Sequence, residues 1–195
     1  MKTFILPGMG ATGAMYPGPW TRLPEATFIE WPLDDRSETI PELAATLIEK
    51  FGITSSDRVI GSSFGGMVGC EISNLITLKK VILFGSASHP SEIRKPLRFL
   101  HPLIKLTPLK LIHRLGTHSS HLPLSMFSKT DPTFTRRMTL AVFQWQGDQG
   151  RSPLIRVHGI KDPVIRPHQT AHLINGGHLI ATTHAQECLK YLPST

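Results

Sequence analysis

The sequence predicts an α/β fold, in which helices flank a mostly parallel sheet of about six strands and a helical cap is inserted. Short apolar runs alternate with segments whose apolar residues recur at helical spacing. The runs read as continuous apolar stretches rather than as alternating ones, which is typical of strands buried on both faces of a parallel sheet. A length of 195 residues and a hydrophobic fraction of 40% suit a single domain, residues 1–195, with a substantial core.

Each expected strand is a short apolar run followed by glycine or polar residues. The strands are residues 4–6, 27–31, 59–60, 80–85, 154–159 and 171–174. Helices with an apolar face are expected at residues 40–51, 64–78 and 184–192. The first has clear boundaries, because Thr39 suits the N-cap, Pro41 the first turn and Gly52 the C-terminal stop. Successive parallel strands would be joined by right-handed crossovers.

The alternation stops at residues 88–150, where no strand pattern appears. Helical patches at 96–115 and 134–145 predict a helical cap or lid inside the domain. This segment holds nine Lys or Arg and three acidic residues, and so six of the seven net positive charges. A solvated helical face explains this charge. A site for an anionic acyl carrier, such as a phosphopantetheine or coenzyme A thioester, is the functional alternative, with Arg94, Lys95 and Arg98 as candidate contacts.

The composition also bounds location and cofactors. No apolar run is long enough to span a membrane, and none at the N-terminus resembles a signal peptide, so we expect a cytoplasmic protein. Cys70 and Cys188 fall in expected helices without metal-ligand spacing, which favours buried thiols. We expect no metal and no organic cofactor. We also expect no nucleic-acid partner, because the basic segment lacks interleaved aromatic residues and a nucleic-acid-binding motif.

The most informative stretch is Gly61-Ser62-Ser63-Phe64-Gly65, a G-x-S-x-G that directly follows an apolar strand. A serine on a sharp strand-to-helix turn needs small residues two positions away, because bulkier ones prevent the turn from closing. Only Ser63 fits this frame, since Ser62 would require glycine where Ile60 and Phe64 stand. The alternative interpretation is a glycine-rich turn without a chemical role.

In parallel α/β sheets the chemistry lies at the carboxyl ends of the strands. The reactive residues that follow the expected strands are Gly8 and Met9, Asp34 and Asp35, Ser63, Ser86 to Ser88, Asp162, and Gly177 with His178. A serine hydroxyl needs a base in hydrogen-bond reach, and the base needs an orienting group. Ser63, Asp162 and His178 supply these groups in the chain order serine, acid, histidine.

Four motifs in this order resemble the α/β-hydrolase family. They are LPGMG at residues 6–10, GSSFGG at 61–66, HGIKDPVI at 158–165 and GGH at 176–178. The resemblance covers nearly the whole chain except residues 88–150, which correspond to the variable cap of that family. The family's usual first strands are absent and the spacing from Asp162 to His178 is tight, so we expect a truncated, six-stranded version.

The resemblance implies roles for these residues. Ser63 would attack an acyl carbonyl, His178 would carry its proton, and Asp162 would orient the imidazole. The backbone N–H groups of Met9 and Phe64 would form the oxyanion hole. The implied activity is hydrolysis of a small-molecule ester or thioester through an acyl-enzyme. An acyltransferase and a non-catalytic binding protein of the same fold are the alternatives.

Several residues have a competing interpretation. Asp162 suits a simple turn before Pro163, with Asp35 as the fallback acid, and His178 has a rival in His184, whose position better suits a helix cap. His158, at a strand end, is expected to be packed in the core. The large apolar side chains that fit an acyl pocket fit the core at least as well: they are Met15, Tyr16, Trp20, Phe127, Phe143 and Trp145.

Overall fold

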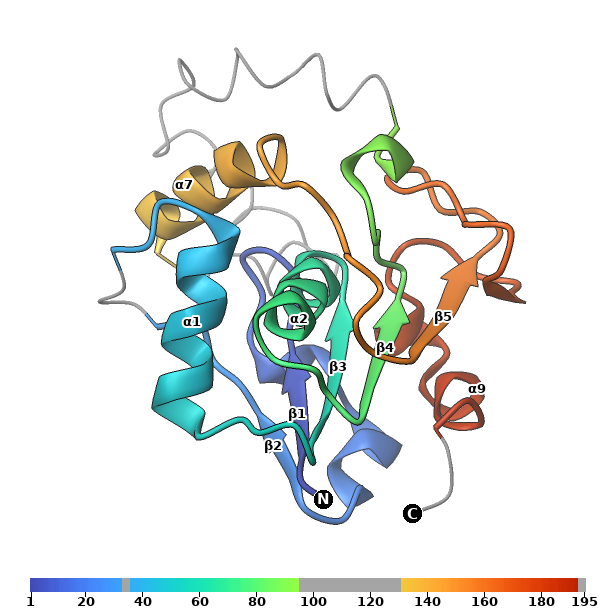
Figure 1. The fold of residues 1–195 in the computed structure, drawn as a ribbon. Coiled ribbons are helices and arrows are strands. Elements are labelled where there is room, and N and C mark those ends of the chain that lie inside the picture. The colour runs from blue at the N-terminus through green and yellow to red at the C-terminus, as the bar shows by residue number, and fades with distance from the viewer. Residues whose placement is uncertain (33–35, 95–130, 193–195) are drawn as a thin grey trace.

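The computed structural model describes residues 1–32, 36–94 and 131–192, which form a sheet of six parallel strands in the order β2-β1-β3-β4-β5-β6 (Figure 1). The strands are β1 (Thr3–Leu6), β2 (Ala26–Phe28), β3 (Arg58–Ser62), β4 (Lys80–Phe84), β5 (Leu154–Gly159) and β6 (His172–Ile174). The predicted α/β fold class is confirmed. Because all neighbouring strands are parallel, their carboxyl ends meet at one edge of the sheet.

The helices cover both faces of this sheet, and each face has its own apolar core. The α-helices are α1 (Ile40–Phe51), α2 (Phe64–Leu75), α7 (Pro132–Val142), α8 (Ile180–Thr183) and α9 (Ala185–Leu189), and the short 3-10 helices are η1 (Gly13–Met15), η2 (Gly18–Arg22) and η3 (Pro90–Glu92). Helices α1, α2 and α7 contribute to one core. Helices η1, η2, α8 and α9 contribute to the other, which explains why the central strands are apolar on both sides.

Local sequence signals account for the boundaries of α1. The Thr39 hydroxyl accepts a hydrogen bond from the Glu42 N–H at 3.3 Å, and Gly52 ends the helix in the left-handed conformation. Both assignments are confirmed. The connection that follows leads into β3, the strand that carries the G-x-S-x-G turn at its end.

Two elements differ from the prediction. Strand β2 ends at Phe28 rather than residue 31, and the Trp31 indole N–H instead donates to the Gly8 carbonyl at 3.1 Å. The helix predicted at 184–192 is shorter, since α9 covers Ala185–Leu189, and it is preceded by α8, which the sequence did not predict.

The described parts of residues 88–150 pack against the rest of the domain. Helix α7 corresponds to the helix predicted at 134–145 and lies at the carboxyl edge of the sheet (Figure 1). The chain returning from it is held by α2, where buried Glu71 accepts the Trp145 indole N–H at 2.8 Å. The helix predicted at 96–115 lies outside the described residues. Within the described ranges, no helix is long and apolar enough to cross a membrane.

Candidate active site

Ser63 occupies a strained turn between β3 and α2. Its φ of 50° and ψ of −121° place a non-glycine residue in a backbone region that typically costs about 1–3 kcal/mol. A Cβ on Gly61 would overlap the backbone of Gly65, and a Cβ on Gly65 would overlap the Pro7 carbonyl. The glycines of the motif are therefore required by close backbone approach, and the predicted turn geometry is confirmed.

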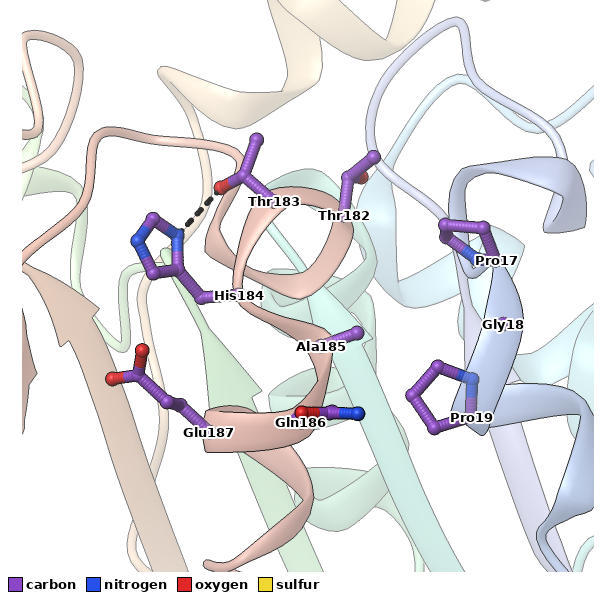
Figure 2. Close-up of a pocket in the computed structure, with 9 residues that line it drawn as sticks. All are labelled: Pro17, Gly18, Pro19, Thr182, Thr183, His184, Ala185, Gln186 and Glu187. Atoms are coloured by element: carbon purple, nitrogen blue, oxygen red, sulfur yellow. Dashed lines mark hydrogen bonds between the residues drawn. The ribbon is translucent and has the colours of Figure 1, made fainter.

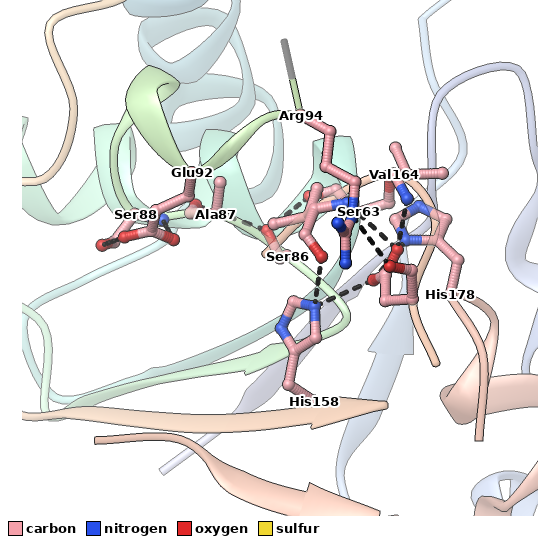
Figure 3. A network of polar contacts seen from close by, with 11 residues as sticks. Ser63, Ser86, Ala87, Ser88, Glu92, Arg94, His158, Val164 and His178 are labelled. Atoms are coloured by element: carbon pink, nitrogen blue, oxygen red, sulfur yellow. Dashed lines mark hydrogen bonds and ion pairs between the residues drawn. The ribbon is translucent and has the colours of Figure 1, made fainter. Parts of the chain in front are cut away.

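Ser63, His178 and Asp162 form a continuous hydrogen-bonded chain. The Ser63 Oγ lies 2.9 Å from His178 Nε2, and His178 Nδ1 lies 2.8 Å from Asp162 Oδ2 (Figure 3). The three residues follow β3, β6 and β5, so the sheet brings together side chains that are up to 115 positions apart in sequence.

The two carboxylate oxygens of Asp162 contact different groups. Its Oδ1 accepts the backbone N–H groups of Val164 at 2.7 Å and Ile165 at 3.0 Å, while Oδ2 faces His178. Only 1% of the residue is exposed. Burial alone would raise the pKa of this carboxyl, but the hydrogen bonds from His158, His178 and the Ile165 backbone outweigh it and hold the pKa well below its usual range.

His158 is the site residue whose contact the sequence did not predict. It is buried, as expected, but its Nε2 lies 2.8 Å from Asp162 Oδ2 and 3.2 Å from the Ile165 carbonyl oxygen (Figure 3). The sequence feature that could have indicated this contact is the position of His158, four residues before Asp162 and buried near the end of β5.

Glycines let the loop of His178 reach the loop of Asp162. A Cβ on Gly159 would overlap the Gly177 carbonyl oxygen, and a Cβ on Gly85 would overlap that of His178. The Lys161 N–H also donates to the Gly176 carbonyl at 2.9 Å. These contacts explain why the HG and GGH motifs occur together.

An apolar cavity of about 210 Å³ opens beside Ser63. Its described lining consists of Met9, Ser63, Phe64, Met67, Ile93, Thr139, Val142, Phe143, Val164 and Ile165. Of the acyl-pocket candidates, Phe143 lies in this lining. Met15, Tyr16, Trp20 and Trp145 are buried in the two cores instead, and Phe127 lies outside the described residues.

The backbone N–H groups of Met9 and Phe64 have no hydrogen-bond acceptor among the described residues. Both residues line the cavity that contains Ser63.

Two serines follow β4 near the turn at Ser63. The Ser86 hydroxyl donates to the Ser63 carbonyl at 2.6 Å and so supports the turn from the end of β4. Ser88 instead donates to Glu92, away from the Ser63 side chain.

The start of the insertion is bound to the loop of Asp162. Ile93 pairs with Ile165 as an isolated antiparallel bridge, and the Arg94 N–H donates to the Val164 carbonyl at 3.0 Å. The Arg94 guanidinium Nε also donates to the Asp162 carbonyl at 3.1 Å. The described lining of the cavity therefore includes residues of the 88–150 segment and residues of the loop that contains Asp162.

The rival residues lie elsewhere or outside the described ranges. His184 lines a separate groove of about 360 Å³ between η2 and the α8–α9 junction, where its Nδ1 lies 2.8 Å from the Thr183 hydroxyl (Figure 2). It occupies the N-cap position of α9, as expected, but its side chain makes no cap hydrogen bond to that helix. Asp34 and Asp35 lie outside the described residues.

The two cysteines are buried on opposite faces of the sheet, Cys70 with α2 and Cys188 with α9. Burial raises the pKa of Cys70 well above its usual value and that of Cys188 to about 12, which keeps both thiols protonated. In the described part of the chain, no three His, Cys, Asp or Glu side chains gather as they would around a metal ion.

Comparison with known proteins relates the chain to solved structures alone. No family model and no curated protein matches the sequence. The N-acyl homoserine lactonase AidH superposes with a TM-score of 0.74 at 16% identity, over 97% of this chain and 86% of the lactonase. A hydrolase from Oleispira antarctica gives a TM-score of 0.74 at 17% identity, over 95% of this chain and 87% of the other.

A type II thioesterase from the borrelidin biosynthetic cluster, BorB, superposes with a TM-score of 0.68 at 17% identity, over 97% of this chain and 89% of the thioesterase. At identities this low the likeness concerns the arrangement of the backbone. That arrangement agrees with the six parallel strands and with the turn at Ser63. The protein therefore has the α/β-hydrolase fold, as its four motifs predicted.

Proposed function

We propose that this protein is a serine hydrolase that cleaves an ester or thioester through an acyl-enzyme. The observation that carries the proposal is the hydrogen-bonded chain from the Ser63 hydroxyl through His178 to Asp162. A buried carboxylate, an imidazole and a serine on a strained turn are the parts that nucleophilic acyl transfer requires. A purely binding role would not need all three in hydrogen-bond contact.

In the proposed reaction, Ser63 Oγ attacks the acyl carbonyl while His178 Nε2 takes its proton. Asp162 holds the Nδ1–H tautomer and stabilises the imidazolium that forms. The proposed oxyanion donors are the backbone N–H groups of Met9, in the loop after β1, and of Phe64, the first residue of the twelve-residue helix α2, each worth about 2.7–4 kcal/mol. His178 then protonates the leaving group, and a water molecule deacylates Ser63 by the same steps.

The cavity beside Ser63 is the proposed acyl site. The described side chains that line it are apolar apart from Ser63 and Thr139, so this part of the cavity suits a hydrocarbon group better than a charged one. Helix α7 contributes Thr139 and Val142, which supports the proposal that residues 88–150 form a cap over the nucleophile.

The choice between ester and thioester depends on the leaving group. The lactonase and the thioesterase among the structural neighbours show that this fold accommodates both bond types. Arg94, a candidate contact for an anionic carrier, already donates to the Asp162 carbonyl, so reversing its charge would also disturb the acid loop. Lys95 and Arg98, which lie outside the described residues, provide the cleaner test. We expect K95E/R98E to weaken hydrolysis of coenzyme A thioesters while sparing p-nitrophenyl esters.

The alternative of acyl transfer to an alcohol or amine shares every step except the acceptor. It is tested by identifying products when the acylated enzyme meets candidate acceptors, because a hydrolase releases mainly free acid. The small-molecule acyl substrate and the cytoplasmic location stay predictions.

The proposed function is tested directly with a fluorophosphonate probe. We expect wild-type protein to be labelled and Ser63→Ala to resist labelling, while Ser88→Ala, which removes a hydroxyl at the same edge of the sheet, labels normally. Absence of labelling in folded wild type would reject the proposal, and labelling of Ser63→Ala would move the nucleophile elsewhere. Esters and thioesters of graded chain length would then define the substrate.

A further inference from the structure

Two histidines bind one oxygen of Asp162. His178 Nδ1 and His158 Nε2 each lie 2.8 Å from Asp162 Oδ2, one on the side of Ser63 and the other from β5. With the two backbone N–H groups on Oδ1, the carboxylate has four donors around it. His158 takes no part in the relay to Ser63, so its position calls for a separate explanation.

The surroundings of His158 determine where its proton lies. Its Nε2 faces both Asp162 Oδ2 and the Ile165 carbonyl oxygen, and a carbonyl oxygen only accepts hydrogen bonds. An unprotonated Nε2 would place its lone pair against two acceptors. His158 Nε2 therefore carries a hydrogen and donates it to the carboxylate.

We propose that His158 is a positioning residue, which fixes the Asp162 carboxylate toward His178 and shares the negative charge of Oδ2. The inference rests on the proposed function and adds a fourth side chain to it. Sharing the charge limits how strongly Asp162 holds a proton on His178. An imidazolium held too tightly returns its proton less readily to the leaving group.

The geometry favours this role over simple core packing. His158 is 2% exposed, and an apolar residue would fill that space without leaving a polar ring to satisfy. It also joins Asp162 to the Ile165 carbonyl, three positions along the loop that Oδ1 already organises. Both ends of the carboxylate are thus held, and rotation away from His178 would break several hydrogen bonds.

The test compares His158→Leu with His158→Gln, whose amide nitrogen stands in for Nε2. We expect His158→Leu to lower kcat/KM by roughly ten- to a hundredfold per labelled active site, the range supported by one hydrogen bond to a charged group. The acid limb of the kcat/KM profile should move to higher pH, because Oδ2 then interacts more strongly with the protonated His178. His158→Gln should recover most of both properties.

Other charged groups are unchanged in these variants. Among the described residues, the histidines and charged residues bonded to residues 162–166 are His158, His178, Arg94 and Glu92, the last through its backbone carbonyl to the Arg166 N–H. Leu47→Ala, in the core of α1, serves as a destabilised control that leaves the site intact and should keep the wild-type pH profile. In an Asp162→Ala background, His158→Leu should have no further effect on kcat.

The proposal is overturned if His158→Leu keeps the wild-type kcat/KM and acid limb, or if its effect multiplies with that of Asp162→Ala. Failure of the proposed function gives a different result, namely wild-type protein that neither labels nor hydrolyses. In that case the NMR titration of the His178 ring decides. A shift between wild type and His158→Leu supports the positioning role, and an unchanged titration rejects it.

Discussion

Two hollows of this molecule each have a lining hydroxyl beside a histidine, and they differ in what the histidine contacts on its other side. At the cavity of about 210 Å³, the lining residue Ser63 contacts His178, which contacts buried Asp162 in turn. In the larger groove of about 360 Å³, His184 contacts the hydroxyl of Thr183, its neighbour in sequence. No carboxylate of a described residue bonds to His184.

The size of a hollow therefore does not identify the candidate catalytic site. A hydroxyl next to a histidine in sequence arises from local geometry, whereas the Ser63 site needs three strand ends to meet. Among the described residues, only the latter brings together a buried carboxylate, backbone N–H groups without an acceptor and an apolar wall. Substitutions at matched positions in the two hollows test this difference.

Replacing the histidine at each hollow should give the largest difference in kcat between the two sites. We expect His178→Ala to lower kcat by about 10⁴- to 10⁶-fold, the scale seen when a catalytic histidine of a serine hydrolase is removed. His184→Ala should change kcat by no more than about twofold, because it touches neither Ser63 nor Asp162. Steady-state kinetics with an activated ester measures both, and comparable losses would contradict the assignment.

The acids should differ in the same way. Asp162→Asn should reduce kcat by roughly 10⁴-fold, as does loss of the acid in another Ser-His-Asp triad, because the imidazole then adopts the wrong tautomer. Glu187→Gln, in the groove of His184, is the matched control. A Glu187→Gln loss that approached the Asp162→Asn loss would place the chemistry in the other hollow.

One glycine near each hollow tests whether close contact with neighbouring backbone requires glycine there. Gly65→Ala forces a Cβ into the Pro7 carbonyl, and we expect it to lower the free energy of unfolding by about 1–3 kcal/mol and to impair labelling of Ser63. Gly18→Ala meets no atom within 4 Å and costs about 1 kcal/mol for its φ of 61°, with labelling unaffected. Urea unfolding monitored by tryptophan fluorescence gives both values.

The low pKa of Asp162 predicts a pH dependence of stability. Because hydrogen bonds depress the folded-state pKa below the unfolded value of about 3.9, the ionised carboxylate stabilises the fold fully above that pH. This stabilisation is lost as pH falls toward the folded-state pKa. The difference in unfolding free energy between wild type and Asp162→Asn should therefore narrow from pH 5 to pH 2. A difference that widened on acidification would contradict the assignment.

The smallest expected effect concerns substrate choice. Val142→Phe enlarges a side chain that lines the cavity, so activity should shift several-fold toward shorter acyl groups, mainly through KM. Thr182→Val, in the other groove, should leave the chain-length profile unchanged. Rates measured over a series of p-nitrophenyl esters test whether the acyl group occupies this cavity.

Much of the fold was predictable because its signals are local. The cap at Thr39 and the stop at Gly52 depend on neighbours in sequence, and the apolar runs mark strands whatever lies around them. Two boundaries differ from the prediction. Trp31 lies beyond the end of β2 and donates to the Gly8 carbonyl, 23 positions away, which a local pattern does not show. Helix α9 ends at Leu189 rather than at residue 192.

The candidate site divides in the same way. From the sequence, glycine sterics and the strand ends predicted the turn at Ser63 and the chain order of Ser63, Asp162 and His178. Only the tertiary structure shows that His178 rather than His184 lies against Ser63 and Asp162, and that His158 also contacts Asp162. The physical reason is that a hydrogen bond depends on a few tenths of an ångström between side chains, which sequence spacing does not specify.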